Sequence, residues 1–289
     1  MPKSSSNDLF VLIKSLKKSE KRYFKVYPSR RAKGELIYIR LFDAIDKQSK
    51  YNEPKLLKKL KTIPPARLSD LKNYLYQMIL NSVESFYAGN TVTAKLKKLL
   101  SHAEFLYERS IYSQCAKILS KAKHIAYKYD KYLQLVEIIG LEKALYIRGG
   151  MQGTGNYMEN IIWEKKMVLK KLDNEIKYKD LRYTLFNHYY RSGITRNEKE
   201  VNAYRKIMSS DLCSQESKAL SYNAKSDFYF VNGLYYYAVK DFKNSFIYYQ
   251  KLVTLIESHP ERLHEQPEMF KYITALSNYH IASYLSKNY

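Results

Sequence analysis

The feature that most constrains this chain is a run of helical spacings between residues 229 and 257. Tyr229 is followed four residues later by Gly233 and three further on by Tyr236, which keeps them on one face of an α-helix. After a turn near Lys240 the helical steps continue through Phe242, Ser245, Tyr249 and Leu252. The stretch predicts two antiparallel helices that approach closely at the small residues Gly233 and Ser245.

This spacing resembles one tetratricopeptide repeat. The same steps fit a second stretch, whose residues are Leu99, Ala103, Leu106, Tyr112, Cys115, Leu119 and Ala122. A third stretch begins with Leu276, His280, Ser283 and Tyr289, and His280 is large where the motif prefers Gly or Ala. The resemblance covers about half of the chain and implies an α-α superhelix, a TPR-like solenoid of stacked antiparallel helix pairs.

The scarcity of helix breakers points to the same class. The 289 residues include nine Gly and seven Pro, and four of the Gly are crowded between positions 149 and 155. Long stretches therefore carry no breaker, which favours helices over hairpins. We expect an all-α fold, with residues 91–289 forming the repeats.

Residues 1–90 are predicted to form a separate helical module that ends at Gly89 and Asn90. Asn52 is the predicted cap of a helix ending before Pro64 and Pro65, and Ser69 that of a longer helix. The stretches LFVLIKSLKKSEKRYFK, YIRLFDAIDKQSKY and LKNYLYQMILNSVESF resemble the opening of uncharacterised bacterial proteins with helical repeats, which imply no activity.

The charge of the chain is concentrated in this module. The formal net charge is +22, and residues 1–100 hold 22 Lys or Arg against 8 Asp or Glu. Such an excess attracts phosphate groups. The candidate phosphate contacts are Lys17, Lys18, Lys21, Arg22, Arg30, Arg31 and Lys33. A divergent helix-turn-helix with Lys72, Asn73 and Gln77 on its recognition helix is a further hypothesis, although its turn is long.

Localisation is predicted from what the sequence lacks. Cys115 and Cys213 are too few for a disulfide framework, no secretory signal is visible, and no apolar run is long enough for a membrane span. We therefore expect a cytoplasmic protein without membrane insertion.

The middle of the chain carries two features that resemble sites. The Gly cluster from Gly149 to Gly155 lacks the Lys-Ser/Thr ending of a phosphate-binding loop, so we interpret it as an inter-helix loop. Separate helices are predicted on either side of residues 173–178. Trp163 lies at helical spacing from Met167, which favours a core position over an exposed anchor.

No catalytic constellation is evident. The six His are scattered, no His stands at a recognisable spacing from either Cys, and the carboxylates intermingle with Lys. We expect neither an enzyme nor a cofactor or metal ion. The predicted function is a protein–protein interaction scaffold that binds a peptide or protein segment in the concave groove of the solenoid. The candidate contacts are Asn187, Tyr190, Arg191, Asn232, Tyr235 and Tyr236, with Tyr236 also suited to interhelical packing. A nucleic-acid-associated regulator is the alternative.

The last repeat is predicted to be incomplete. Residues 276–289 supply a first helix that still carries apolar residues, and no second helix follows to cover them. We expect either further chain or another molecule to cover this end.

Overall fold

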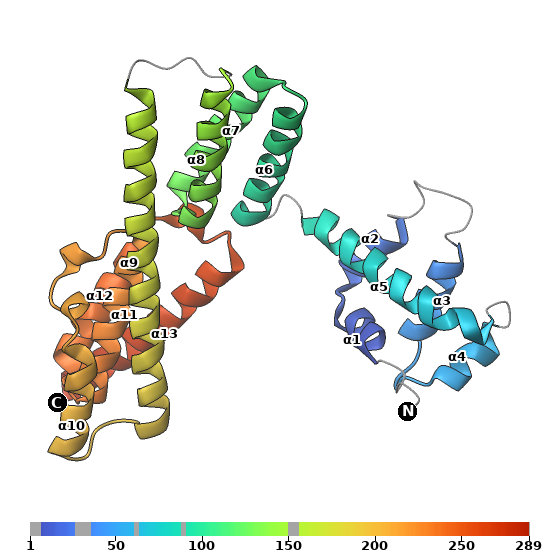
Figure 1. Cartoon of the computed structure of the whole chain (residues 1–289). Helices are drawn as coiled ribbons and strands as arrows, with labels where there is room; N and C mark the ends of the chain where they lie inside the picture. Colours follow the sequence, from blue (N-terminus) through green and yellow to red (C-terminus); the bar gives the residue numbers. More distant parts are fainter. Residues whose placement is uncertain (1–6, 27–35, 61–63, 88–90, 150–155, 289) are drawn as a thin grey trace. The chain divides into compact units, whose positions relative to one another are not determined.

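The computed structural model describes residues 7–26, 36–60, 64–87, 91–149 and 156–288 (Figure 1). All regular structure in these ranges is helical, which confirms the expected all-α class. The chain divides into two compact units, Met1–Ala94 and Lys95–Tyr289, which are described separately below. The predicted boundary residues Gly89 and Asn90 lie outside the described residues.

The first unit packs four shorter helices around a long one. Its helices are α1 (Asp8–Ser15), α2 (Lys18–Val26), α3 (Leu36–Asp46), α4 (Glu53–Lys59) and α5 (Pro65–Tyr87). α5 packs against α1, α2 and α3, because Leu75 and Ile79 lie on its inward face. Phe24 and Phe42 pack in the same core with ring centroids 4.7 Å apart and the rings tilted by 32°.

The helix starts in this unit test two predictions. Asn52 caps α4 as predicted, since its side chain accepts a hydrogen bond from the Lys55 amide at 2.9 Å. The prediction that Ser69 caps the next helix is wrong, because α5 begins four residues earlier at Pro65. A proline fits the first helical position, where its missing amide hydrogen costs nothing, and the Arg67 amide donates to the Pro64 carbonyl.

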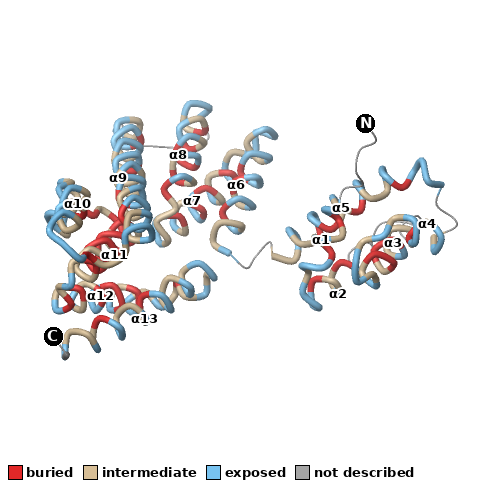
Figure 2. Tube along the Cα trace, turned by 90° about the horizontal axis from the view of Figure 1, so that it is seen from below, coloured by how far each residue is buried: buried red, intermediate tan, exposed pale blue. Residues whose placement is uncertain are grey.

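The second unit is built around α11. In chain order it contains α6 (Val92–Glu108), α7 (Tyr112–Lys128), α8 (Tyr132–Ile147), α9 (Tyr157–Ser192), α10 (Glu198–Met208), η2 (Asp211–Cys213), η3 (Glu216–Lys218), α11 (Tyr222–Ala238), α12 (Phe242–Glu257), η4 (Pro260–Arg262) and α13 (Gln266–Asn288). Buried residues are densest on α11 (Figure 2), which lies against both α9 and α12. α12 in turn packs against α13, and α8 packs against α7 and α9.

Small residues lie at two helix contacts where the spacing predicted them. Gly233 faces the Tyr249 ring so closely that an added Cβ would approach its atoms to 2.9–3.0 Å. The Ser245 hydroxyl donates to the Gly233 carbonyl at 2.9 Å. In the earlier stretch the buried Cys115 thiol makes the equivalent contact, 3.3 Å from the Ala103 carbonyl. Both pairs are separated by 12 residues along the chain.

Three turns between consecutive helices share one geometry. Ser110, Asp130 and Lys240 each adopt a positive φ, between 50° and 67°. In the turn at Ser110, the Ile111 amide donates back to the Leu106 carbonyl and the Ser110 amide to the Tyr107 carbonyl. The other two turns repeat both hydrogen bonds at the same offsets. This left-handed cap satisfies carbonyls at the end of the first helix and directs the chain into the next one.

α9 differs from the prediction of two separate helices. It is continuous over 36 residues, because no Gly or Pro interrupts positions 157–192. Its middle is anchored by Asn174, whose side chain donates to the Lys218 carbonyl at 2.9 Å and accepts from the Leu220 amide at 3.0 Å. The helix ends at Gly193, which has a φ of 68°.

The predicted core position of Trp163 is wrong. Its side chain is 65% exposed, because Ile161 and Val168 form the buried face of this part of α9 and Trp163 lies off that face. The spacing that linked Trp163 to Met167 is helical, but helical spacing alone does not show which face is covered.

The residues of α13 that face the core are not the ones predicted. The small buried residues are Ala275 and Ala282, whereas His280 is exposed. Tyr279 packs against the core and Tyr284 is 71% exposed. Tyr289 lies outside the described residues. Among the described helices, none combines the length and the apolar character that crossing a membrane requires.

Candidate functional site

Two hollows lie along one face of α11. The α11 residues that line them are spaced by four, three, four and three positions, so they share one side of the helix. They are Asn223, Asp227, Phe230, Leu234 and Tyr237. Residues of α9 and α13 complete both hollows. We call this combined surface the three-helix face.

The lining residues also show how the three helices run. One hollow is lined by Glu175 of α9 and Lys271 of α13, and the other by residues further along both helices, including Phe186 and Ile281. The same order holds on α11, where Asn223 lines the first hollow. α9, α11 and α13 are therefore parallel to one another. α12 follows α11 through a tight turn and packs against both α11 and α13.

The first hollow, with a volume of about 360 Å³, is charged. Arg182 donates to Asp227 at 2.8 Å, and its guanidinium lies 4.3 Å from the centroid of the Phe230 ring. Lys271 pairs with Glu268 of its own helix at 3.0 Å. Positive and negative groups thus both line this hollow, and the Phe230 ring packs against the Arg182 guanidinium.

Glu175 is a partly buried acid of this hollow. Burial raises the pKa of its carboxyl, while hydrogen bonds from Ser221 at 2.6 Å and Asn223 at 3.1 Å act in the opposite direction. The nearby Asp130 and Asp227 carboxylates raise the pKa further. The group is therefore a stronger proton acceptor than an exposed glutamate.

The second hollow, with a volume of about 190 Å³, is mainly apolar. Leu234 and Tyr249 form its buried floor, and burial raises the pKa of the Tyr249 phenol, which therefore stays protonated. At the rim, Phe186 is 47% exposed and Ile281 48% exposed. Asn278 and Thr274 of α13 supply the polar atoms. This hollow offers a place for an apolar side chain, with hydrogen-bonding groups at its edge.

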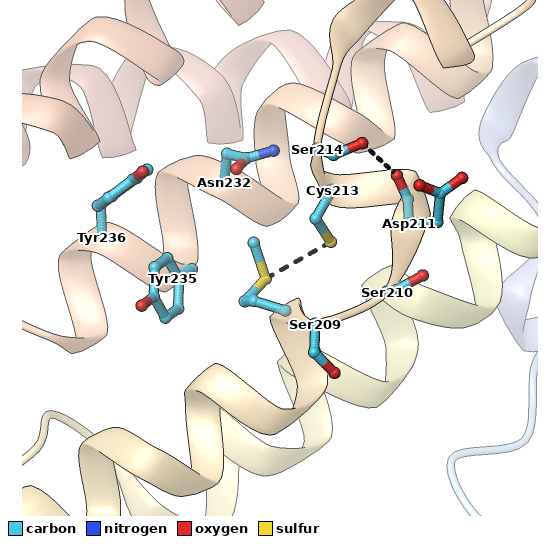
Figure 3. A pocket seen from close by; sticks show the side chains of 9 residues that line it. Ser209, Ser210, Asp211, Cys213, Ser214, Asn232, Tyr235 and Tyr236 are labelled. Carbon is cyan, nitrogen blue, oxygen red and sulfur yellow. Dashed lines mark hydrogen bonds between the residues drawn. The ribbon is translucent and has the colours of Figure 1, made fainter.

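Three of the predicted contacts lie on another face of α11. Asn232, Tyr235 and Tyr236 line a third hollow, of about 410 Å³, together with the segment from Met208 to Ser214 (Figure 3). Asn232 is buried and donates to the Phe228 carbonyl at 2.9 Å. Tyr236 stacks on Tyr248 with ring centroids 5.6 Å apart, which is the interhelical packing considered for it from the sequence.

The other predicted contacts, on α9, are exposed. Tyr190 is 82% exposed, and Asn187 and Arg191 are also exposed. None of the three is among the residues lining the two hollows of the three-helix face. The structure thus does not bring the six predicted contacts together at one hollow.

The third hollow is also lined by Cys213, the last residue of η2. The Cys213 thiol lies 3.9 Å from the Met208 sulfur, and the Ser214 hydroxyl donates to the Asp211 carbonyl (Figure 3). Burial raises the pKa of the Cys213 thiol to about 11. A thiol in this state is a weak nucleophile at neutral pH, because only the thiolate attacks.

The predicted phosphate contacts of the first unit fall into three groups. Lys21 forms an ion pair with Asp46 at 2.7 Å, so part of its charge is neutralised. Lys17, Lys18 and Arg22 are exposed. The remaining three, Arg30, Arg31 and Lys33, lie outside the described residues.

One proposed contact residue of the hypothetical recognition helix already has partners within the first unit. Lys72 donates to Glu53 at 2.7 Å and to the Tyr51 hydroxyl at 3.1 Å, which holds it against α4. Asn73 and Gln77 of the same helix are exposed. Lys72, one of the three proposed base contacts, is therefore already bonded to side chains of its own unit.

Within the described residues, no group of His, Cys, Asp and Glu is arranged to hold a metal ion. The Gly cluster falls almost wholly outside those residues, with only Gly149 described. Comparison of the chain with family models, with curated proteins and with solved structures finds no match.

Helical spacing in the sequence groups the α11 residues of the three-helix face, but it does not distinguish this side of α11 from the others. Asn223, Asp227 and Phe230 follow helical steps, but so do the residues on every other side of this mostly apolar helix. Which side stays open depends on where α9 and α13 pack, and that arrangement is decided by contacts remote in the chain.

Proposed function

We propose that this chain is a non-enzymatic protein-interaction scaffold that binds a segment of a protein partner on the three-helix face. The observation that carries the proposal is the continuity of that face, from the charged hollow around Arg182 to the apolar hollow beside Phe186. A surface of this kind suits a peptide that presents a charged group and an apolar side chain at a fixed separation.

A TPR-like superhelix is the architecture we infer for the second unit. Two equivalent contacts support it, the Ser245 hydroxyl on the Gly233 carbonyl and the Cys115 thiol on the Ala103 carbonyl. The shared turn geometry and the parallel course of α9, α11 and α13 also support it. In such a solenoid the first helices of successive pairs line one surface, which is where partners usually bind.

The rim of the apolar hollow provides the test. A peptide-display library is selected against the full chain, and enriched peptides are then titrated against variants. Phe186→Ser with Ile281→Ser removes both exposed rim side chains without opening the buried floor. We expect affinity to fall by about tenfold or more, as for loss of an anchor worth over 1.4 kcal/mol.

The matched control is Phe105→Ser, which removes a 55% exposed phenylalanine from α6. Its affinity for the same peptides should equal that of the unaltered chain. Peptides that bind the rim variant as well as the unaltered chain would show that partners bind elsewhere.

Nucleic-acid binding by the first unit stays a prediction from its charge. No contact of the described residues favours it, and Lys21 and Lys72 are both paired with carboxylates. The cytoplasm remains the compartment we propose, since a reducing environment suits the free thiols of Cys115 and Cys213.

A further inference from the structure

A regular row of exposed apolar side chains runs along α9. At every seventh position from 162 to 190 an Ile, Leu or Tyr is exposed, by 43%, 44%, 51%, 55% and 82% in chain order. The residues are Ile162, Leu169, Ile176, Tyr183 and Tyr190, which we call the heptad stripe. Figure 2 shows how much of this helix lies at the surface.

The stripe is separate from the face that α9 uses inside its own unit. The buried positions of α9 are Ile161, Val168, Tyr178 and Leu185, which pack toward α8 and α11. A helix needs only one apolar face to join its own core. The additional row has one exposed apolar residue per heptad over about 42 Å of helix, which offers a narrow seam to a second helix.

The charges beside the stripe indicate what that second helix is. Asp173 precedes Ile176 by three residues and Lys179 follows it by three, and both side chains are exposed. Asp173 pairs with Lys177 of its own helix at 2.6 Å, an exposed ion pair that can exchange partners at little cost. If a second copy of α9 lies antiparallel on a two-fold axis at Ile176, Asp173 of each copy faces Lys179 of the other. Both ion pairs then form at once. In a parallel arrangement Asp173 would face Asp173, which is repulsive.

The apolar residues obey the same symmetry. With the axis at Ile176, Leu169 of one copy lies opposite Tyr183 of the other, and Ile162 opposite Tyr190. We propose that the chain self-associates through the heptad stripe as an antiparallel α9–α9 dimer. Most of this interface lies outside the proposed peptide site, because Ile162, Leu169 and Ile176 line neither hollow of the three-helix face. Tyr183 of the stripe and the neighbouring Lys179 also line the charged hollow, so the two surfaces meet there.

The mass of the full chain in solution tests the proposal. Sedimentation equilibrium at high micromolar concentration should give twice the 34.2 kDa mass of one chain. Ile176→Glu places two carboxylates on the two-fold axis and should yield a monomer, and Leu169→Glu should do the same. Circular dichroism shows whether each variant keeps its helices. Phe105→Glu, at an equally exposed phenylalanine outside the stripe, should stay a dimer.

The orientation is tested by exchanging the charges. Asp173→Lys and Lys179→Asp, made singly, should each weaken the dimer, because both set like charges against each other across the interface. The double exchange should restore it, since every antiparallel pair is again of opposite sign. A monomeric unaltered chain, or a dimer that survives both Glu variants, would overturn the proposal. A double exchange no better than its parents would overturn the antiparallel arrangement.

Discussion

Arg262 and Asp130 form an ion pair across 132 residues of chain, with Nη2 and Oδ2 3.1 Å apart. Only 7% and 14% of their side chains are exposed. Arg262 also donates to the Lys128 carbonyl at 2.9 Å and stacks over the Tyr222 ring at 4.2 Å. The pair thus fastens the turn between α7 and α8 to the loop between α12 and α13.

Arg262→Met should destabilise the second unit strongly. It leaves the largely covered Asp130 carboxylate without its counter-charge, and breaking a fully buried pair in this way costs about 3–5 kcal/mol, which is the upper bound here. Chemical denaturation measures the loss. Asp130→Asn serves as the second arm of a double-mutant cycle, because asparagine tolerates the positive φ at this position. The double variant should lose less than the two single losses together, and simple additivity would show that the two side chains are not coupled.

Two glycines of this unit should respond in opposite directions to alanine. At Gly233 the new Cβ would lie 2.9–3.0 Å from the Tyr249 ring, so Gly233→Ala should lower the free energy of unfolding by about 1–3 kcal/mol. At Gly140, in α8, no atom lies within 4 Å of the added Cβ. Gly140→Ala should therefore raise stability by about 0.5–1 kcal/mol, since alanine is the better helix former.

Urea denaturation of both variants gives the comparison. Equal effects at the two positions would mean that helix propensity alone decides them and that the close contact at Gly233 carries no cost. The larger Gly233→Leu substitution should destabilise the fold further than Gly233→Ala.

These contacts show what could be predicted from the sequence. The Asn52 cap and the close approach at Gly233 depend on residues a few positions apart, or on two helices joined by one turn. Local spacing contains that information. The continuity of α9 was also a local property, because no Gly or Pro interrupts positions 157–192, whereas the contacts that anchor Asn174 involve residues more than 40 positions further along the chain.

The location of the candidate site was harder still to predict, because it depends on contacts between helices remote in the chain. The face of α11 with Asn232 and Tyr236 and the face with Asp227 and Phe230 both carry polar and aromatic residues. Only the positions of α9 and α13 make the second face an open surface between parallel helices. The prediction that Trp163 lies in the core was wrong for a similar reason. α8 covers a neighbouring side of α9 and leaves the indole exposed.

Glu175→Gln should stabilise the protein at neutral pH. Burial raises the pKa of Glu175 above its ordinary value of 4.5, so the folded state holds this proton more tightly than the unfolded state. Stability is then lost as pH rises from about 4.5 through the folded pKa. Glutamine avoids that loss, and its side-chain oxygen can still accept from Ser221 and Asn223.

Urea denaturation of both proteins at about pH 4 and at about pH 7 measures this effect. The advantage of the variant should be larger at the higher pH. An advantage that is the same at both values would show that the substitution acts through packing and not through the carboxyl charge.

Cys213 should react slowly with iodoacetamide in the folded protein. With its pKa raised to about 11 by burial, about one thiol in a thousand is ionised at pH 8, whereas an unperturbed cysteine is ionised to about a quarter.

Cys115→Ser isolates this thiol for measurement, and the serine can keep the contact with the Ala103 carbonyl as Ser245 does with Gly233. The alkylation rate of the folded variant should rise about tenfold per pH unit up to pH 10. It should increase abruptly in denaturant, where the thiol regains its ordinary acidity. A rate that levels off near pH 9 in the folded protein would show that the thiol is not desolvated and that the hollow around Cys213 is open to solvent.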